Sequence, residues 1–221
     1  MKIVFMGTPD FAVASLNAIH QSSHDIVGVV TVPDRQTGRG LKITTSPVKD
    51  YALSHNIPVL QPEKLGDSTF QEQLKLLNAD IFVVVAFRML PKSVWGMPPM
   101  GTFNLHASLL PQYRGAAPIN WAIINGETET GVTTFFLNER IDEGKILLQT
   151  KTPITENDNA ESLHDRLAEI GKHLVIETLD RIERGDIIPQ PQPENVEYKP
   201  APKIFKADCA INWNSNGNSV V

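Results

Sequence analysis

The chain has 221 residues, of which 41% are hydrophobic, and this size predicts one folded domain with an appendage and excludes a disordered chain. The formal net charge of −5 argues weakly against a nucleic-acid-binding surface, which is usually basic. No apolar run approaches the roughly 18 residues that span a bilayer, and the single cysteine, Cys209, excludes an internal disulfide and fits a reducing cytoplasm.

Strands and helices alternate along the first half of the chain. Buried strands are predicted over residues 2–6, 26–32, 57–60 and 81–87, and helices over residues 11–20, 46–55 and 68–78. Residues 33–42 are predicted to form a loop, and a short helix near residues 91–95 precedes a strand that carries Asn104 and His106. This spacing predicts a Rossmann-like α/β fold, with a mostly parallel twisted sheet and helices on both faces.

The second half has a different pattern. Two strands, over residues 130–137 and 145–151, flank a loop that contains Asp142. Residues 160–184 form a long amphipathic helix, with Asn159 or Asp158 as its N-cap and Gly185 at its end. Prolines are frequent from Pro189 onward, which indicates a linker or an extended wrap over the surface. We therefore expect a catalytic domain over residues 1–188 and a linker over residues 189–221.

Ligands of open parallel sheets bind beyond the carboxyl ends of the strands, and Gly7, Phe87, Asn104 and His106 lie at or near such ends. Asn104 and His106 are two residues apart, so their side chains point to one face of a strand and can converge on one oxygen. Asp142 can orient and charge the imidazole if two strands run side by side. Taken alone, a polar pair such as Asn104 and His106, or an aspartate in a turn such as Asp142, more often has a structural role than a catalytic one. Together they suit transfer of a small acyl group to an amine.

Other patterns narrow the possibilities. Only one glycine, Gly7, follows the first strand, which counts against binding of NAD and against a P-loop. No His, Cys, Asp or Glu residues have metal-ligand spacing, so no metal site is predicted. Arg35, Arg39 and Lys42 lie in the loop over residues 33–42, which reads either as a solvated surface loop or as a cationic segment that meets phosphate.

The combined motifs resemble those of the folate-dependent formyltransferases over nearly the whole chain. They are Phe103 to Pro111, Tyr113-Arg114-Gly115, Gly131-Val132-Thr133 and Asp142-x-Gly144. Further segments resemble the branch that acts on methionyl-tRNA: residues 7–12, the loop over residues 33–40 with Ser46-Pro47-Val48, and residues 201–206 with 211–213. That branch also carries a small C-terminal β-barrel domain that helps to hold tRNA, and we expect it to be absent from this sequence.

The resemblance implies a cytoplasmic, monomeric enzyme of translation initiation that has no membrane partner. It implies transfer of the formyl group of 10-formyltetrahydrofolate to the α-amine of initiator methionyl-tRNA, through a tetrahedral intermediate and without a metal. Asn104 and His106 would donate to the oxyanion, and Asp142 would hold the imidazole and favour its charged form. The implied folate contacts are Phe87, Arg88, Met89, Leu90, Ser108, Leu109, Leu110, Pro111, Asn138 and Glu139. The implied tRNA or methionyl contacts are Thr8, Phe11, Arg39 and Lys42.

Three alternatives remain open. The same chemistry could act on an amino sugar nucleotide or on glycinamide ribonucleotide, although the loop around Arg39 and the C-terminal tail argue against both. A catalytically silent folate-binding domain has no need for all of Asn104, His106 and Asp142. An NAD-dependent oxidoreductase lacks support because the glycine fingerprint is missing.

Overall fold

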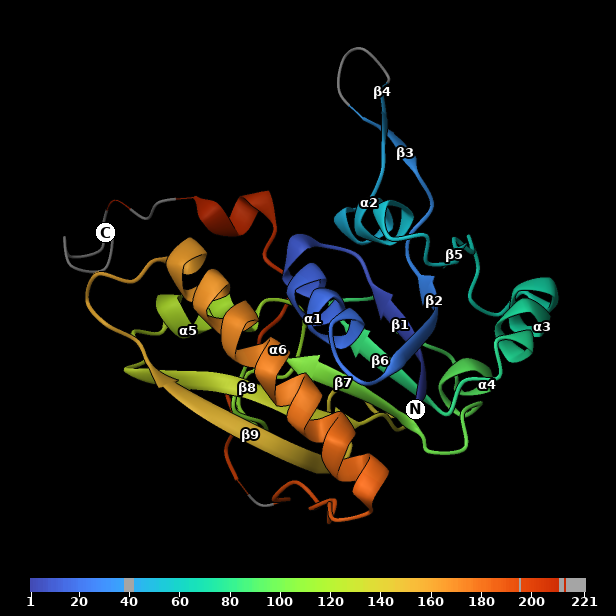
Figure 1. The fold of residues 1–221 in the computed structure, drawn as a ribbon. Coiled ribbons are helices and arrows are strands. Elements are labelled where there is room, and N and C mark those ends of the chain that lie inside the picture. Colours follow the sequence, from blue (N-terminus) through green and yellow to red (C-terminus); the bar gives the residue numbers. More distant parts are fainter. Residues whose placement is uncertain (38–41, 195, 211–212, 214–221) are drawn as a thin grey trace.

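A seven-stranded sheet forms the centre of the molecule in the computed structural model, which describes residues 1–37, 42–194, 196–210 and 213 (Figure 1). In spatial order the strands are β5 (Val59–Leu60), β2 (Asp25–Val30), β1 (Lys2–Gly7), β6 (Ile81–Val85), β7 (Thr102–His106), β8 (Glu129–Phe136) and β9 (Ile146–Pro153). The first five strands pair in parallel, whereas β8 runs antiparallel to both β7 and β9. The predicted Rossmann-like, mostly parallel sheet is confirmed.

Helices cover both faces of the sheet. They are α1 (Asp10–His20), α2 (Pro47–Ser54), α3 (Ser68–Leu76), α4 (Lys92–Trp95), α5 (Pro118–Ile124) and α6 (Ala160–Arg184), followed by the short 3-10 helix η1 (Lys206–Cys209). Side chains alternate along β1: Ile3 and Phe5 join the core that contains α1 and α6, whereas Val4 and Met6 join a second core with α3 and α4. The continuous apolar runs in the sequence therefore reflect strands that are buried on both faces.

Two elements differ from the prediction. The expected loop over residues 33–42 contains a short antiparallel hairpin, β3 (Arg35–Thr37) and β4 (Lys42–Thr44), which projects from the body of the molecule (Figure 1). Its strands are three residues long, too short for an alternating pattern to show in the sequence. Helix α5 was not predicted either; its Pro118 lies at the start of the helix, where the missing N–H costs nothing.

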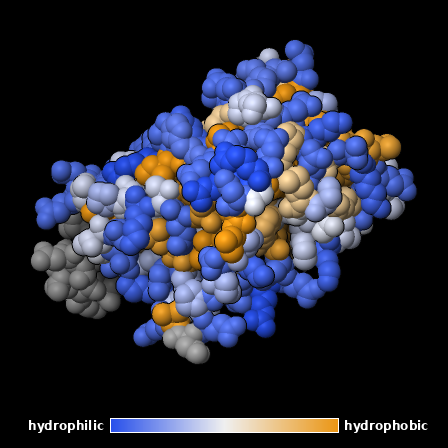
Figure 2. Space-filling view, turned by 60° about the horizontal axis from the view of Figure 1, so that its bottom comes forward, coloured by the Kyte–Doolittle hydropathy of each residue, from blue (hydrophilic) through white to orange (hydrophobic). Residues whose placement is uncertain are grey.

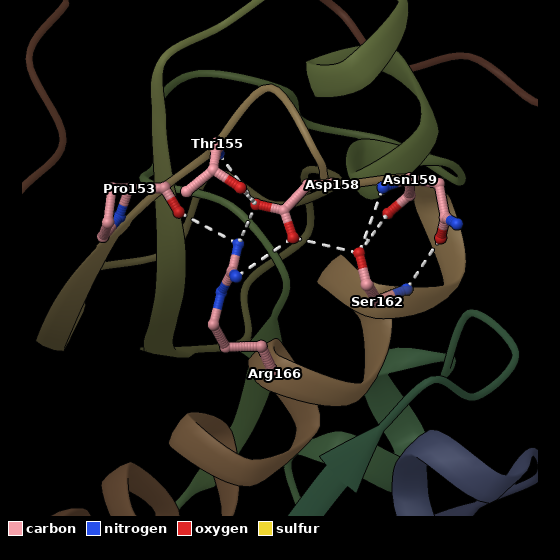
Figure 3. Close-up of polar contacts among 6 residues, drawn as sticks. All are labelled: Pro153, Thr155, Asp158, Asn159, Ser162 and Arg166. Atoms are coloured by element: carbon pink, nitrogen blue, oxygen red, sulfur yellow. Dashed lines mark hydrogen bonds and ion pairs between the residues drawn. The ribbon is translucent and has the colours of Figure 1, made fainter.

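Helix α6 has the predicted bounds because its ends carry strong local signals. The Asn159 side chain accepts a hydrogen bond from the Ser162 backbone N–H, and the Ser162 hydroxyl oxygen accepts one from Asn159 N at 3.0 Å (Figure 3). Asn159 is therefore the N-cap. At the other end Gly185 adopts a left-handed φ of 69°, which glycine takes without strain.

Asp158 fastens the turn between β9 and α6 (Figure 3). Its carboxylate accepts two hydrogen bonds from the Arg166 guanidinium, at 3.0 and 2.7 Å, and further bonds from the Thr155 backbone and hydroxyl. The Arg166 pair, followed by the Thr155 N–H, holds the pKa of Asp158 well below its ordinary value. This cluster is structural, because it joins the end of the sheet to the first two turns of α6.

The chain returns to the sheet after α6. Gln190 pairs with Ile146 at the start of β9, and Ala201 forms a parallel bridge with Gly115. The described residues of 190–202, which we call the strap, thus follow the surface of the domain as an extended wrap. The boundary at residue 188 stays a prediction.

The surface shown in Figure 2 is mainly hydrophilic, with hydrophobic side chains in scattered groups. Among the described residues, no helix combines the length and apolar character that crossing a membrane requires.

Candidate active site

Three neighbouring strands end at one edge of the sheet. Gly7 of β1 pairs with Val85 of β6, and Val84 pairs with Asn104 of β7. Thr8, Phe87 and His106 consequently lie at the same edge. This is where ligands of open α/β sheets bind.

Asn104 and His106 share a face of β7, as predicted. Phe103 and Leu105 enter the core beneath α6, so the two polar side chains point to the opposite face. His106 is only 6% exposed. The side-chain oxygen of Asn104 is buried and has no hydrogen-bond partner among the described residues. An unpaired buried polar atom costs about 1–3 kcal/mol, so the amide is stabilised once a ligand supplies a partner.

The two nitrogens of the His106 imidazole have different surroundings. Nε2 lies 2.8 Å from the Tyr113 carbonyl oxygen. Because a carbonyl only accepts, Nε2 carries a hydrogen. Nδ1 lies 4.0 Å from Oδ2 of Asp142, and that carboxylate is mostly buried. The carbonyl thus fixes the ring, and Nδ1 is the nitrogen that faces the carboxylate.

Asp142 reaches His106 through a loop that turns back over the sheet. Because β8 is antiparallel to β7, the loop to β9 starts at the far end of β7, where the Leu137 N–H donates to the Thr102 carbonyl at 2.8 Å. Asp142 has a left-handed φ of 53°, and its Oδ2 accepts a hydrogen bond from Gly115 N at 2.9 Å. A Cβ atom on Gly144 would lie 1.6 Å from the Phe136 carbonyl oxygen, so only glycine fits there.

Sequence reasoning missed Gln192, which is 8% exposed and contacts this loop. Its amide nitrogen donates to the carbonyls of Asp142 and Gly144, at 2.8 and 2.9 Å. Its oxygen accepts from Nε and Nη2 of Arg114, at 3.1 and 2.6 Å. The only signal in the sequence is that Gln192 stands between two prolines, and the proline content suggested a linker instead.

The predicted folate segment, Phe87–Leu90, follows β6 as irregular backbone. The Arg88 guanidinium donates to the carbonyls of Pro62 and Glu63, at 2.8 and 3.0 Å, and lies over the Phe87 ring. Burial, with a smaller contribution from Arg35, lowers the pKa of Arg88. Met89 is 77% exposed, whereas Leu90 is buried. The segment therefore offers backbone groups and an apolar surface at the edge of the sheet where His106 also lies.

The predicted folate-contact segment Ser108–Pro111 is held by hydrogen bonds to other residues of the protein. The Ser108 hydroxyl donates to the Gln112 carbonyl at 2.6 Å, and the Ser108 carbonyl accepts from the Thr133 hydroxyl at 2.6 Å. Leu110 N donates to the same Thr133 oxygen at 3.2 Å. Thr133 lies directly opposite His106 in the sheet, so this segment braces the end of β7. Leu109 is half-buried, and Pro111 follows the buried Leu110.

Other predicted site residues lie apart from the candidate catalytic trio of Asn104, His106 and Asp142. Asn138 accepts from Arg140 N, and Glu139 pairs with Lys92 at 2.7 Å, both shortly after Leu137 at the far end of β7. The Lys92 ammonium lowers the pKa of Glu139.

The residues predicted to contact the tRNA or its methionyl group differ in exposure and position. Thr8 is half-buried at the site edge, whereas Phe11 is 7% exposed and packs in the core against His164. Arg39 lies outside the described residues, and so does the side chain of Lys42. These assignments stay predictions.

One group of metal-type ligands occurs in the described part of the chain, at His24, Asp180 and Glu183. Nε2 of His24 lies 3.1 Å from Asp180 and Nδ1 lies 3.9 Å from Glu183, so each ring nitrogen faces a different carboxylate. The Met1 ammonium also pairs with Glu183 at 3.1 Å. These contacts form a polar network that joins the N-terminus and the residue before β2 to α6.

Comparisons with known proteins identify the sequence family and similar folds. A sequence profile described as formyl transferase matches residues 1–179. A methionyl-tRNA formyltransferase of Bacteroides fragilis is 57% identical over 217 residues, which are 97% of this chain and 67% of that protein. One from Flavobacterium johnsoniae is 54% identical over 220 residues, covering 100% of this chain and 70% of that protein.

Solved structures share the fold. An N-formyltransferase from Helicobacter canadensis, in complex with folinic acid and dTDP-3-aminofucose, has a TM-score of 0.72 at 24% identity, over 100% of this chain and 78% of that one. HypX from Aquifex aeolicus, in complex with tetrahydrofolic acid, has a TM-score of 0.72 at 21% identity, over 100% of this chain and 33% of that one.

Proposed function

The chain belongs to the formyl transferase family, and we propose that it transfers the formyl group of 10-formyltetrahydrofolate to the α-amine of methionyl-tRNA. The observation that carries this proposal is the meeting of Asn104, His106 and Asp142 at the carboxyl edge of the sheet. The close similarity to relatives named for this reaction supports the choice of acceptor.

The proposed reaction is a direct transfer. The neutral α-amine of the methionyl ester attacks the formyl carbon, so a C–N bond forms and the carbonyl oxygen becomes an oxyanion. Collapse of this tetrahedral intermediate breaks the bond to N10 of the folate, and the proton lost by the amine ends on that nitrogen. The step that needs most help is formation of the oxyanion.

Asn104 and His106 are the proposed donors to this oxyanion. The buried side-chain oxygen of Asn104 has no protein partner among the described residues and only accepts, so the proposed donor to the oxyanion is the NH₂ group of the same amide. His106 is held through Nε2 on the Tyr113 carbonyl, which leaves Nδ1 for the reaction. In the imidazolium form Nδ1 also donates, and the Asp142 carboxylate compensates the charge and relays the proton.

The folate site is proposed over the segment after β6. The half-buried Phe87 and the exposed Met89 supply apolar surface, and the surrounding irregular backbone supplies hydrogen-bonding groups, which suits a planar pterin. Ser108–Pro111 shapes the other side. Hydrogen-bond donors supply the charge stabilisation in this mechanism, so the proposal involves no metal.

The acceptor end of the tRNA is placed near Thr8 and the β3–β4 hairpin. Arg35, together with Arg39 and Lys42 in the sequence of the hairpin, gives it a positive charge that suits phosphate. We propose that the protein acts as a monomer in the cytoplasm, on the initiator tRNA of translation.

Single-turnover formyl transfer at high enzyme concentration tests the proposal. 10-Formyltetrahydrofolate is offered with methionyl-tRNA, and in parallel reactions with glycinamide ribonucleotide and an amino sugar nucleotide. We expect formyl-methionyl-tRNA from the wild type and a rate at least about 100-fold lower from His106→Ala. Formylation of another acceptor alone would overturn the acceptor assignment, and release of formate without transfer would indicate a hydrolase.

A further inference from the structure

The structure assigns Gln192 the role of a positioning residue that sets the Asp142 carboxylate against His106. This inference rests on the proposed function, because it concerns the geometry of the same catalytic trio. It starts from the strap, whose proline-rich sequence resembles a spacer but which contacts both backbone segments around the trio.

Gln192 joins these two segments with a single side chain. Its NH₂ group donates to the carbonyls of Asp142 and Gly144, and its oxygen accepts two N–H bonds from Arg114. Carbonyls only accept and a guanidinium only donates, so the orientation of the amide is unambiguous. Both N–H donors and both acceptor positions of the amide are therefore used, in a side chain that is 8% exposed.

Arg114 closes the arrangement into a ring. Its Nη1 pairs with Glu143 at 3.2 Å, and its guanidinium lies over the ring of Tyr198 in the strap. The next residue, Gly115, donates its N–H to Oδ2 of Asp142. Gln192 thus fixes the backbone of Asp142, while the residue after Arg114 fixes its carboxylate.

The strap also holds the turn that fixes His106. Tyr113 N donates to the Lys199 carbonyl at 2.7 Å, and Ala201 N donates to the Arg114 carbonyl at 2.8 Å. Tyr113 is the residue whose carbonyl accepts from Nε2 of His106. The strap therefore positions both His106 and Asp142. Among the described residues, Gln192 makes the strap's only contact with the carbonyl of Asp142.

Asp142 needs this support because its backbone is left-handed, at a φ of 53°. Such a conformation is unfavourable for a non-glycine residue and persists when its surroundings hold it. Without the two donors of Gln192, we expect the loop to relax and Oδ2 to leave the Gly115 N–H and His106.

The test compares Gln192→Ala and Gln192→Glu with Gln190→Ala. Gln190 is an exposed neighbour whose side chain, among the described residues, donates only to the Ile188 carbonyl, so it is a matched control. Gln192→Glu keeps the acceptor for Arg114 but loses both donors. We expect both Gln192 variants to lower kcat about 10- to 100-fold, because small misplacements of catalytic groups are costly, with KM for the folate changed less than about twofold.

Two further readouts separate positioning from general destabilisation. Amide hydrogen exchange at Gly115 should become at least about tenfold faster in Gln192→Ala, whereas the Ala116 amide, which donates to the Ala201 carbonyl at 2.7 Å, should be unchanged. The relative activity of Gln192→Glu should rise as the pH falls, since protonation of the introduced carboxyl restores one donor.

The outcomes distinguish this inference from the proposed function. Unchanged kcat together with unchanged Gly115 exchange overturns the positioning role, and so does equal acceleration of Gly115 and Ala116, which indicates only a loosened fold. If the wild type fails to formylate methionyl-tRNA, the proposed function fails, but the exchange at Gly115 still decides whether Gln192 positions Asp142.

Discussion

Asn104 and His106 lie on a regular strand, whereas Asp142 lies on a loop with left-handed backbone at that residue. The strand is held on both sides by β6 and β8, and its alternation alone sends both polar side chains to one face. The loop instead depends on Gly115, on the strap and on the absence of a side chain at Gly144. The positions of Asn104 and His106 therefore follow from secondary structure, whereas Asp142 has to be positioned by distant residues.

The largest effect should come from a change on the strand, Asn104→Ala. Loss of this proposed oxyanion donor should lower kcat about 100- to 1,000-fold. The free energy of unfolding should stay the same or rise, because the variant removes a buried oxygen that has no partner in the protein. Single-turnover transfer and chemical denaturation measure the two quantities. A clear loss of stability would mean that the amide has a structural role instead.

On the loop, Asp142→Asn should lower kcat about 100-fold. The neutral amide replaces the carboxylate that is proposed to compensate the charge of the imidazolium. Asparagine tolerates a left-handed backbone and its oxygen can accept from Gly115 N, so the melting temperature should change little. The same transfer assay and a thermal scan are sufficient. Near-normal activity would show that Asp142 has no part in the chemistry.

Gly144→Ala should act on the loop through sterics alone. The added Cβ would meet the Phe136 carbonyl oxygen at 1.6 Å, so the backbone must shift, at a cost of about 1–3 kcal/mol in the free energy of unfolding. The matched control is Gly66→Ala, where a Cβ meets nothing within 4 Å and a gain of about 0.5 kcal/mol is expected. Urea denaturation measures both variants, and equal stabilities would contradict the close approach at Gly144.

The smallest effect concerns Asp158, which lies away from the trio at the start of α6. Arg166 keeps the folded-state pKa of Asp158 below its ordinary value of about 4, so its carboxylate stabilises the fold above that pH. The stability is lost as the pH falls through the depressed folded-state pKa. The difference in melting temperature between the wild type and Asp158→Asn should therefore be present at pH 7 and shrink below about pH 4. Glu156→Gln, an exposed neighbour, serves as the control, and a difference that grows in acid would reverse the assigned sign.

Much of the fold follows from local pattern. The buried strands β1, β2 and β6 read as apolar runs, and α6 carries both its cap at Asn159 and its stop at Gly185. Helix α5 and the β3–β4 hairpin did not follow from local pattern, because their seven and three residues show no distinctive periodicity.

The sequence by itself determined the order of most strands and helices, the shared face of Asn104 and His106, and the residue types that make formyl transfer the proposed reaction. Only the tertiary structure decided that the loop after β8 turns back to bring Asp142 within 4.0 Å of His106, and that Gln192 holds it there. The physical reason is the range of the interactions. Periodicity reports which face of an element is buried, but contacts between residues 36 or 50 positions apart are selected by the packing of the whole sheet.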